Sequence, residues 1–205
     1  EGAIQSAIEM QHALLPFNEV GKNLGRPPIQ IGVGLHSGNL MLGTVGEEER
    51  MDGTVISDAV NLAARLEGLT KDYGARIIVS ERLMNSVAKT GSFHSRCLGH
   101  ASVKGKQQAT MIFEILDGDE DDASRKKIVS KPFFERGVRA LEKGDHVRAR
   151  KFFKRALQLH KQDAAASIFL KKASDALQEK GLSPSEEERK KIHSISTQAA
   201  KGSKV

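Results

Sequence analysis

Apolar residues recur at two different spacings along the first part of the chain. In residues 3–23 they return every three or four positions, which predicts a helix disturbed at Pro16. In residues 29–35 they alternate with Gln and Gly, which predicts a strand. A turn at residues 37–39 then predicts that residues 40–45 return as the hairpin partner of that strand.

The stretch GTVISDAVNLAAR, residues 53–65, passes from a predicted strand into a predicted helix, capped by Ser57 or Asp58 and ended by Gly74. Asn61 and Arg65 are four residues apart and therefore share one face of this helix. That face is not the apolar stripe, which consists of Ala59, Leu62, Leu66, Leu69 and Tyr73. Such a pair is usually part of a solvated surface, so the surrounding pattern must decide its role.

The rest of the chain shows two secondary-structure patterns, first mixed strands and helices and then helices alone. A short strand at residues 76–79, a helix capped by Ser80, and two strands within residues 93–116 joined at 104–106 complete a mixed pattern. Alternating strands and helices indicate an α+β or α/β fold. We expect an acidic linker at 117–130, a purely helical unit at 131–181 and a disordered tail at 182–205.

Charge and composition support this division into two units. The formal net charge is +6, and the excess of Lys and Arg lies after Leu116. The single cysteine, Cys97, rules out an internal disulfide, and no Cys/His spacing predicts a zinc site. No run of apolar residues is long enough for a transmembrane helix, and no signal peptide is evident, so we expect a cytoplasmic protein.

Three separated motifs carry a family resemblance. The series IQIGVGLHSGNLMLGTVG, RMDGTVISDAVNLAARLEGLTKDYGARIIVSE and VKGKQQATMIFEIL resembles the class III adenylate/guanylate cyclase catalytic domain over residues 1–116. The resemblance implies an α+β fold, namely the C-terminal part of a ferredoxin-like cyclase domain. It also implies a homodimer with active sites at the interface. It leaves open whether an upstream segment tethers the parent protein to a membrane.

The resemblance also implies roles for individual residues. Asn61 would orient the ribose, Arg65 would stabilise the α-phosphate in the transition state, and Lys104 would hold the terminal phosphates. Thr54 and the backbone of Val55 would read the purine edge. The substrate would be ATP rather than GTP, and the products a cyclic 3′,5′-monophosphate and pyrophosphate.

Family members use two Mg or Mn ions, and the Asp residues that bind them are expected upstream of Glu1. The chain would then supply no metal ligand, only the ribose, transition-state and phosphate half of the site. We therefore expect it to be inactive alone.

The helical unit resembles one tetratricopeptide (TPR) repeat of helix–turn–helix type, followed by a packing helix at residues 164–179. Its pattern consists of Phe133, Gly137, Gly144, Ala149, Phe153 and Ala156. A single repeat buries too little surface to be stable alone, so we expect it to dock on the cyclase part or on a protein partner. Its basic residues are predicted to be solvated, and no nucleic-acid motif accompanies them.

Two further functions remain open from the sequence. One is a catalytically degenerate cyclase fold that serves as a regulatory or protein-interaction module. The other is an anion-binding module built on the basic helices. An upstream segment with two Asp residues in family context would distinguish the cyclase from the degenerate fold.

Overall fold

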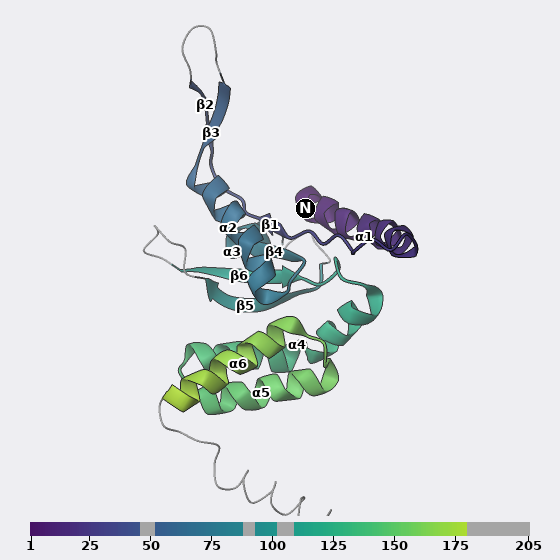
Figure 1. Ribbon diagram of the computed structural model, residues 1–205. Helices are drawn as coiled ribbons and strands as arrows, with labels where there is room; N and C mark the ends of the chain where they lie inside the picture. Colours follow the sequence, from purple (N-terminus) through teal and green to yellow (C-terminus); the bar gives the residue numbers. More distant parts are fainter. Residues whose placement is uncertain (46–51, 88–92, 102–108, 180–205) are drawn as a thin grey trace, which may run out of the picture.

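The computed structural model describes residues 1–45, 52–87, 93–101 and 109–179 (Figure 1). Lys104, the predicted strand junction at 104–106 and the predicted tail at 182–205 lie outside the described residues. The described residues form two sheets and the helices α1 to α6. This is the mixed α+β architecture that the sequence predicts.

The main sheet has four strands in the order β1-β4-β6-β5. Its middle strands, β4 and β6, are antiparallel to each other, and β1 pairs with β4 in parallel, with Val33 opposite Ile77. The strand bounds are β1 Val33–Leu35, β4 Ile77–Ser80, β5 Ser95–Ala101 and β6 Thr110–Ile115. The pairing of β5 with β6 bears out the two strands predicted within residues 93–116.

A two-stranded ribbon of β2 (Met41–Val45) and β3 (Asp52–Ile56) projects from the body of the molecule (Figure 1). The prediction that residues 40–45 pair back onto the strand before them is therefore wrong. That strand, β1, pairs instead with β4, which lies more than forty residues further along the chain. Alternating apolar residues mark a strand but do not identify its partner, because both pairings satisfy the same pattern.

Each face of the main sheet is covered by helices. On one face, Ile77 and Val79 pack with Ile4, Ala7 and Ile8 of α1 (Gly2–Asn23) and with residues around α3 (Glu81–Val87). On the other face, Ile78 and Ile112 share a core with α2 (Asp58–Tyr73) and the C-terminal helices. Helix α1 runs through Pro16, which does not end it.

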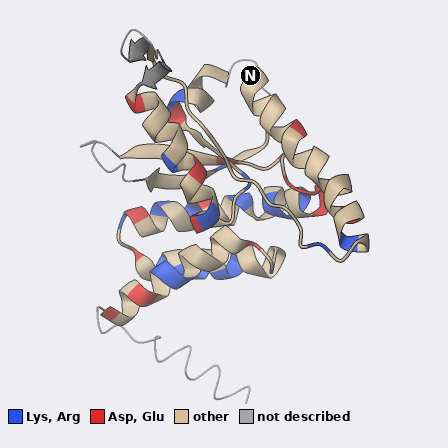
Figure 2. Cartoon of the chain, turned by 45° about the horizontal axis from the view of Figure 1, so that its top comes forward, with Lys and Arg blue, Asp and Glu red and all other residues tan. Residues whose placement is uncertain are grey.

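The C-terminal helices α4 (Asp121–Glu142), α5 (His146–Leu159) and α6 (Ala164–Glu179) form one layer against the sheet (Figure 1). Lys and Arg are frequent along them (Figure 2). The acidic linker predicted at 117–130 is largely wrong, because α4 begins at Asp121. Acidic residues in the first turn suit the partial positive charge of a helix N-terminus, so Asp121 and Asp122 favour this start.

The described helices include none that is both long enough and apolar enough to cross a membrane.

Candidate functional site

Helix α2 presents the two candidate residues on its exposed surface. Asn61 and Arg65 are exposed, whereas Leu62, Leu66 and Tyr73 are buried in the core. The predicted separation of these two residues from the apolar stripe is therefore confirmed. A guanidinium and an amide on a fixed helix can bind phosphate oxygens and a hydroxyl group together.

The start of α2 is fixed by a capping serine. Ser57 accepts a hydrogen bond from the Ala59 amide at 3.0 Å, and its hydroxyl donates to the Asn39 carbonyl at 2.6 Å. These bonds cap the helix and tie it to the segment that precedes β2. Of the two predicted caps, Ser57 is thus the one used. The other end closes at Gly74, which has a φ of 61° and forms a left-handed cap.

The middle of α2 lies directly against β1, at a glycine. A methyl group added at Gly34 would lie 2.2 Å from the Glu67 backbone nitrogen and 2.4 Å from the Ala63 carbonyl oxygen. No side chain larger than a hydrogen fits there without moving the helix. The glycines of the GVG run therefore permit close packing of β1 and α2.

The predicted base-reading residues lie on β3, immediately before α2. Thr54 pairs with Gly43 and Val55 with Leu42 of β2, and only the Ile56–Ser57 step separates this ribbon from the helix. The chain path thus brings the backbone of Thr54 and Val55 close to the N-terminal end of α2. The position of Lys104 relative to them lies outside the described residues.

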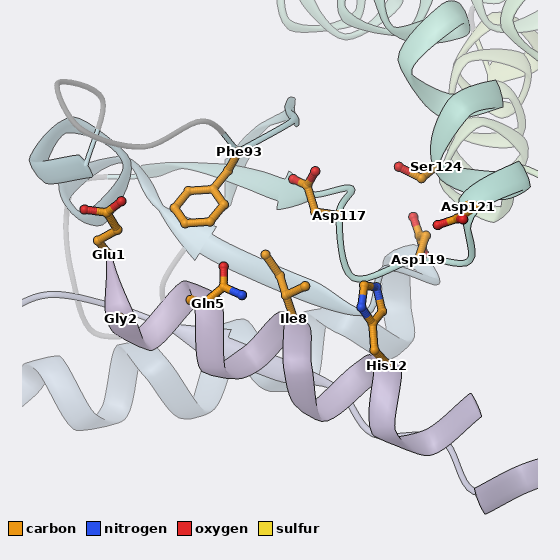
Figure 3. A pocket seen from close by; sticks show the side chains of 10 residues that line it. All are labelled: Glu1, Gly2, Gln5, Ile8, His12, Phe93, Asp117, Asp119, Asp121 and Ser124. Atoms are coloured by element: carbon orange, nitrogen blue, oxygen red, sulfur yellow. The ribbon is translucent and has the colours of Figure 1, made fainter. Parts of the chain in front are cut away.

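The structure also contains a cavity of about 630 Å³ beside α1 that holds none of the candidate residues (Figure 3). Its wall is acidic, and two of its carboxylates are engaged: Asp117 accepts hydrogen bonds from the His94 amide and ring, and Asp119 contacts Lys127. Within the described part of the chain, no group of three or more His, Cys, Asp or Glu residues could hold a metal ion.

A cluster of buried charges joins the sheet to the C-terminal helices. No pattern in the sequence predicts it. Arg96 of β5, with a fully buried side chain, donates to Glu114 of β6 at 2.5 Å. It also forms a two-pronged pair with Asp163, just before α6, at 2.5 and 2.9 Å. Lys127 of α4 completes the cluster with contacts of 2.6 Å to Glu114 and 2.7 Å to Asp119.

The proton affinities in this cluster follow from the pairing. Burial alone would raise the pKa of Asp163, but the hydrogen bond and charge of Arg96 outweigh it and lower that pKa. Burial would likewise lower the pKa of Lys127, yet Glu114 and Asp119 raise it. Burial also raises the pKa of Asp119, and the neighbouring charge of Lys127 opposes that shift.

Comparison with known proteins identifies the family. Residues 1–115 match the adenylate and guanylate cyclase catalytic domain. An adenylate cyclase of Anabaena cylindrica is 44% identical over 119 residues, which is 55% of this chain and 24% of the relative. The terminal-differentiation-specific adenylate cyclase of Dictyostelium discoideum is 29% identical over 171 residues, which is 83% of this chain and 8% of the relative.

Among solved structures, the adenylyl cyclase CyaB from P. aeruginosa aligns with a TM-score of 0.48 and 25% identity, over 58% of this chain and 59% of that one. The chain spans about a quarter or less of the length of the two curated relatives. The alignment with the Dictyostelium protein is longer than the family match, so it also takes in part of the C-terminal helices. Because the family match covers more than half of the chain, the chain belongs to the adenylate and guanylate cyclase catalytic domain family.

Proposed function

We propose that this chain takes part in converting ATP to the cyclic 3′,5′-monophosphate and pyrophosphate, with Asn61 and Arg65 acting on the nucleotide. The observation that carries the proposal is the exposure of both side chains on α2, within the segment that matches the cyclase family. Helix α2 is capped at both ends and packed on β1, so the two groups are presented by a rigid element.

In the proposed reaction the ribose 3′-oxygen attacks the α-phosphorus. A bond forms between these two atoms, the bond from the α-phosphorus to the oxygen bridging to the β-phosphate breaks, and the hydroxyl proton passes to water, so that pyrophosphate is the leaving group. Negative charge grows on the equatorial oxygens of the α-phosphate, where the Arg65 guanidinium can meet it with two hydrogen bonds. The Asn61 amide would hold the ribose so that its 3′-oxygen faces the phosphorus.

The metal ions and the rest of the site would come from elsewhere. Family members generally use divalent metal ions, but the described residues contain no fitting ligand cluster, so no step is assigned to a metal held by them. We propose that Mg or Mn is bound by carboxylates outside the described residues and that a second copy of the catalytic domain completes each site. Lys104 would bind the terminal phosphates.

We further propose that the substrate is ATP rather than GTP. Thr54 and the Val55 backbone, on β3 next to α2, would supply the contacts to the purine edge. The helical unit would serve as a docking surface for protein rather than for nucleic acid.

Substitutions on α2 test the proposal in a protein that contains both this chain and the metal-binding segment. Arg65→Ala should lower kcat by about 100-fold or more, since its contacts form mainly in the transition state. Asn61→Ala should act similarly, whereas Lys104→Ala should also raise KM, because phosphate binding already exists in the ground state. Lys71→Ala, an exposed cation on the same helix, is the matched control and should leave kcat unchanged.

The 205-residue chain alone should show no turnover with magnesium or manganese. Robust activity of this chain alone, or an Arg65→Ala protein as fast as its parent, would contradict the roles proposed here. A longer protein without any cyclase activity would instead favour a degenerate cyclase fold with a regulatory role.

A further inference from the structure

The C-terminal end of α2 is in contact with α6 of the helical unit. Tyr73, the last residue of α2, stacks on Phe169 with ring centroids 5.4 Å apart and planes 13° from parallel. Lys172 lies over both rings, 4.9 Å from the Tyr73 centroid and 5.2 Å from that of Phe169. The next residue, Gly74, meets the start of α6: a methyl group added there would lie 2.5 Å from the Ala164 Cβ.

Phe169 is itself held in place by other rings. Its centroid lies 5.4 Å from that of Phe153 on α5 and 5.5 Å from that of Phe134 on α4. The Arg96 guanidinium of β5 lies 4.1 Å from the Phe134 centroid and is paired with Asp163 at the start of α6. The ring that Tyr73 stacks on is therefore fixed with respect to the sheet, through both aromatic and ionic contacts.

The Tyr73–Phe169 stack adds a third contact that restrains α2, at its C-terminal end. The glycine contact with β1 fixes one face of the helix near Ala63 and Glu67, and Ser57 fixes its start. Contact along one face still leaves tilt and axial rotation open. Tyr73 is eight residues, or about 12 Å, beyond Arg65 on a continuous helix, so a displacement of its ring changes the direction of the Arg65 side chain.

We propose that Tyr73 and Phe169 are positioning residues for the cyclase reaction: their stacked rings let the helical unit set the orientation of α2 and thereby of Asn61 and Arg65. The inference rests on the proposed function of those two residues. Catalytic geometry is sensitive to displacements of about 1 Å, which can cost about 100-fold in rate. Loosening the stack should therefore lower kcat more than it weakens nucleotide binding.

The test compares two identical substitutions in the same hydrophobic core. Phe169→Leu removes the ring that stacks on Tyr73. Phe133→Leu, the matched control, removes a ring of α4 that packs against the same core and lies beside the Arg155 guanidinium. Tyr73→Leu repeats the loss from the α2 side, and Tyr73→Phe keeps the stack. Hydrogen exchange of the α2 amides is measured in the 205-residue chain, at conditions where the variants have equal global stability.

The kinetic constants of the same variants are measured in the active longer protein. We expect Phe169→Leu and Tyr73→Leu to speed exchange in α2 about 10-fold relative to Phe133→Leu. We expect kcat to fall about 10- to 100-fold while KM changes less than about twofold. Tyr73→Phe should restore both quantities.

Equal exchange in Phe169→Leu and Phe133→Leu would overturn the inference, and so would faster exchange without a lower kcat. If the unsubstituted longer protein has no cyclase activity, the proposed function fails. Exchange in α2 then still decides whether Phe169 holds the helix, but the positioning role falls with the reaction it serves.

Discussion

At the scale of single residues, Arg96 has the most unusual environment in the described chain. Its guanidinium is fully buried, paired with Glu114 and Asp163, and lies against the Phe134 ring. A buried ion pair is not in itself evidence of high stability, because desolvation offsets much of the attraction. Removing one partner is different, since it leaves the other charge buried and uncompensated.

We therefore expect Asp163→Asn to lower the free energy of unfolding by about 3–5 kcal/mol. Asp163 also accepts a hydrogen bond from the Ala166 amide at the start of α6, and the side-chain oxygen of Asn can accept the same bond, so the loss comes mainly from the ion pair. Urea denaturation followed by circular dichroism measures the change. Lys126→Ala is the control, because it breaks an exposed pair with Asp122 and should cost no more than about 1 kcal/mol.

The same carboxylate should affect the dependence of stability on pH. The pKa of Asp163 is lower in the folded chain than its usual value of about 3.9. Its contribution is therefore fully present above that pH and is lost as the pH falls through the folded pKa. Asp163→Asn should flatten the stability curve below about pH 4, and an unchanged slope there would contradict the assigned pairing.

At the scale of elements, α2 could be predicted from the sequence and the partner of β1 could not. Ser57, Gly74 and the apolar stripe are local signals, and each lies within one helix length of the residues it organises. The pairing of β1 with β4, by contrast, depends on residues more than forty positions apart. The start of α4 escapes prediction for a different reason: the acidic residues Asp121 and Asp122 suit a linker, but they also suit the first turn of a helix.

In the candidate site, too, features within one helix could be predicted from the sequence, whereas contacts between distant segments could not. Helix spacing places Asn61 and Arg65 on one face, and the family resemblance suggests their roles. The Arg96–Asp163 pair and the Tyr73–Phe169 stack instead join segments that only the fold brings together. A buried arginine on a strand carries no local signal of its burial. The contact between α6 and α2 therefore could not be predicted from sequence patterns.

Two glycine substitutions test the packing of β1 on α2. Gly34→Ala puts a methyl group 2.2 Å from the backbone of α2, so we expect it to lower the free energy of unfolding by about 3 kcal/mol or more. Gly68→Ala is the matched control. Gly68 lies in α2, and a methyl group added there would meet no heavy atom within 4 Å outside the nearby helix backbone, so the substitution should raise stability by up to about 1 kcal/mol. Thermal unfolding of both variants measures the difference, and equal stabilities would show that β1 and α2 can separate without loss.

At the scale of the whole molecule, the two units predicted from the sequence do not each have a core of their own. One continuous cluster joins α2 and the sheet to the C-terminal helices, and its members include Leu66, Ile78, Leu98, Ile112, Phe134, Phe153 and Phe169. A division at Leu116, as the sequence predicts, would expose the apolar face of the sheet on one side and the apolar faces of three helices on the other. The excess of Lys and Arg after Leu116 reflects a difference in surface charge between the two parts of the chain. It does not indicate a boundary between two hydrophobic cores.

We therefore expect that a chain of residues 1–116 does not unfold cooperatively, and that residues 121–179 alone do not form a fixed tertiary structure. The cause is the loss of apolar burial together with the division of the buried charge cluster. The Arg96–Glu114 pair would lose its partners Asp163 and Lys127, which lie in the other piece. Scanning calorimetry of each piece, beside a chain of residues 1–179 as the control, measures this. Mixing the two pieces should restore a single heat-absorption peak, because the interface between them is the interior of one core. A sharp transition in residues 1–116 alone would show instead that the cyclase part is an independent domain, and that the helices only rest on its surface.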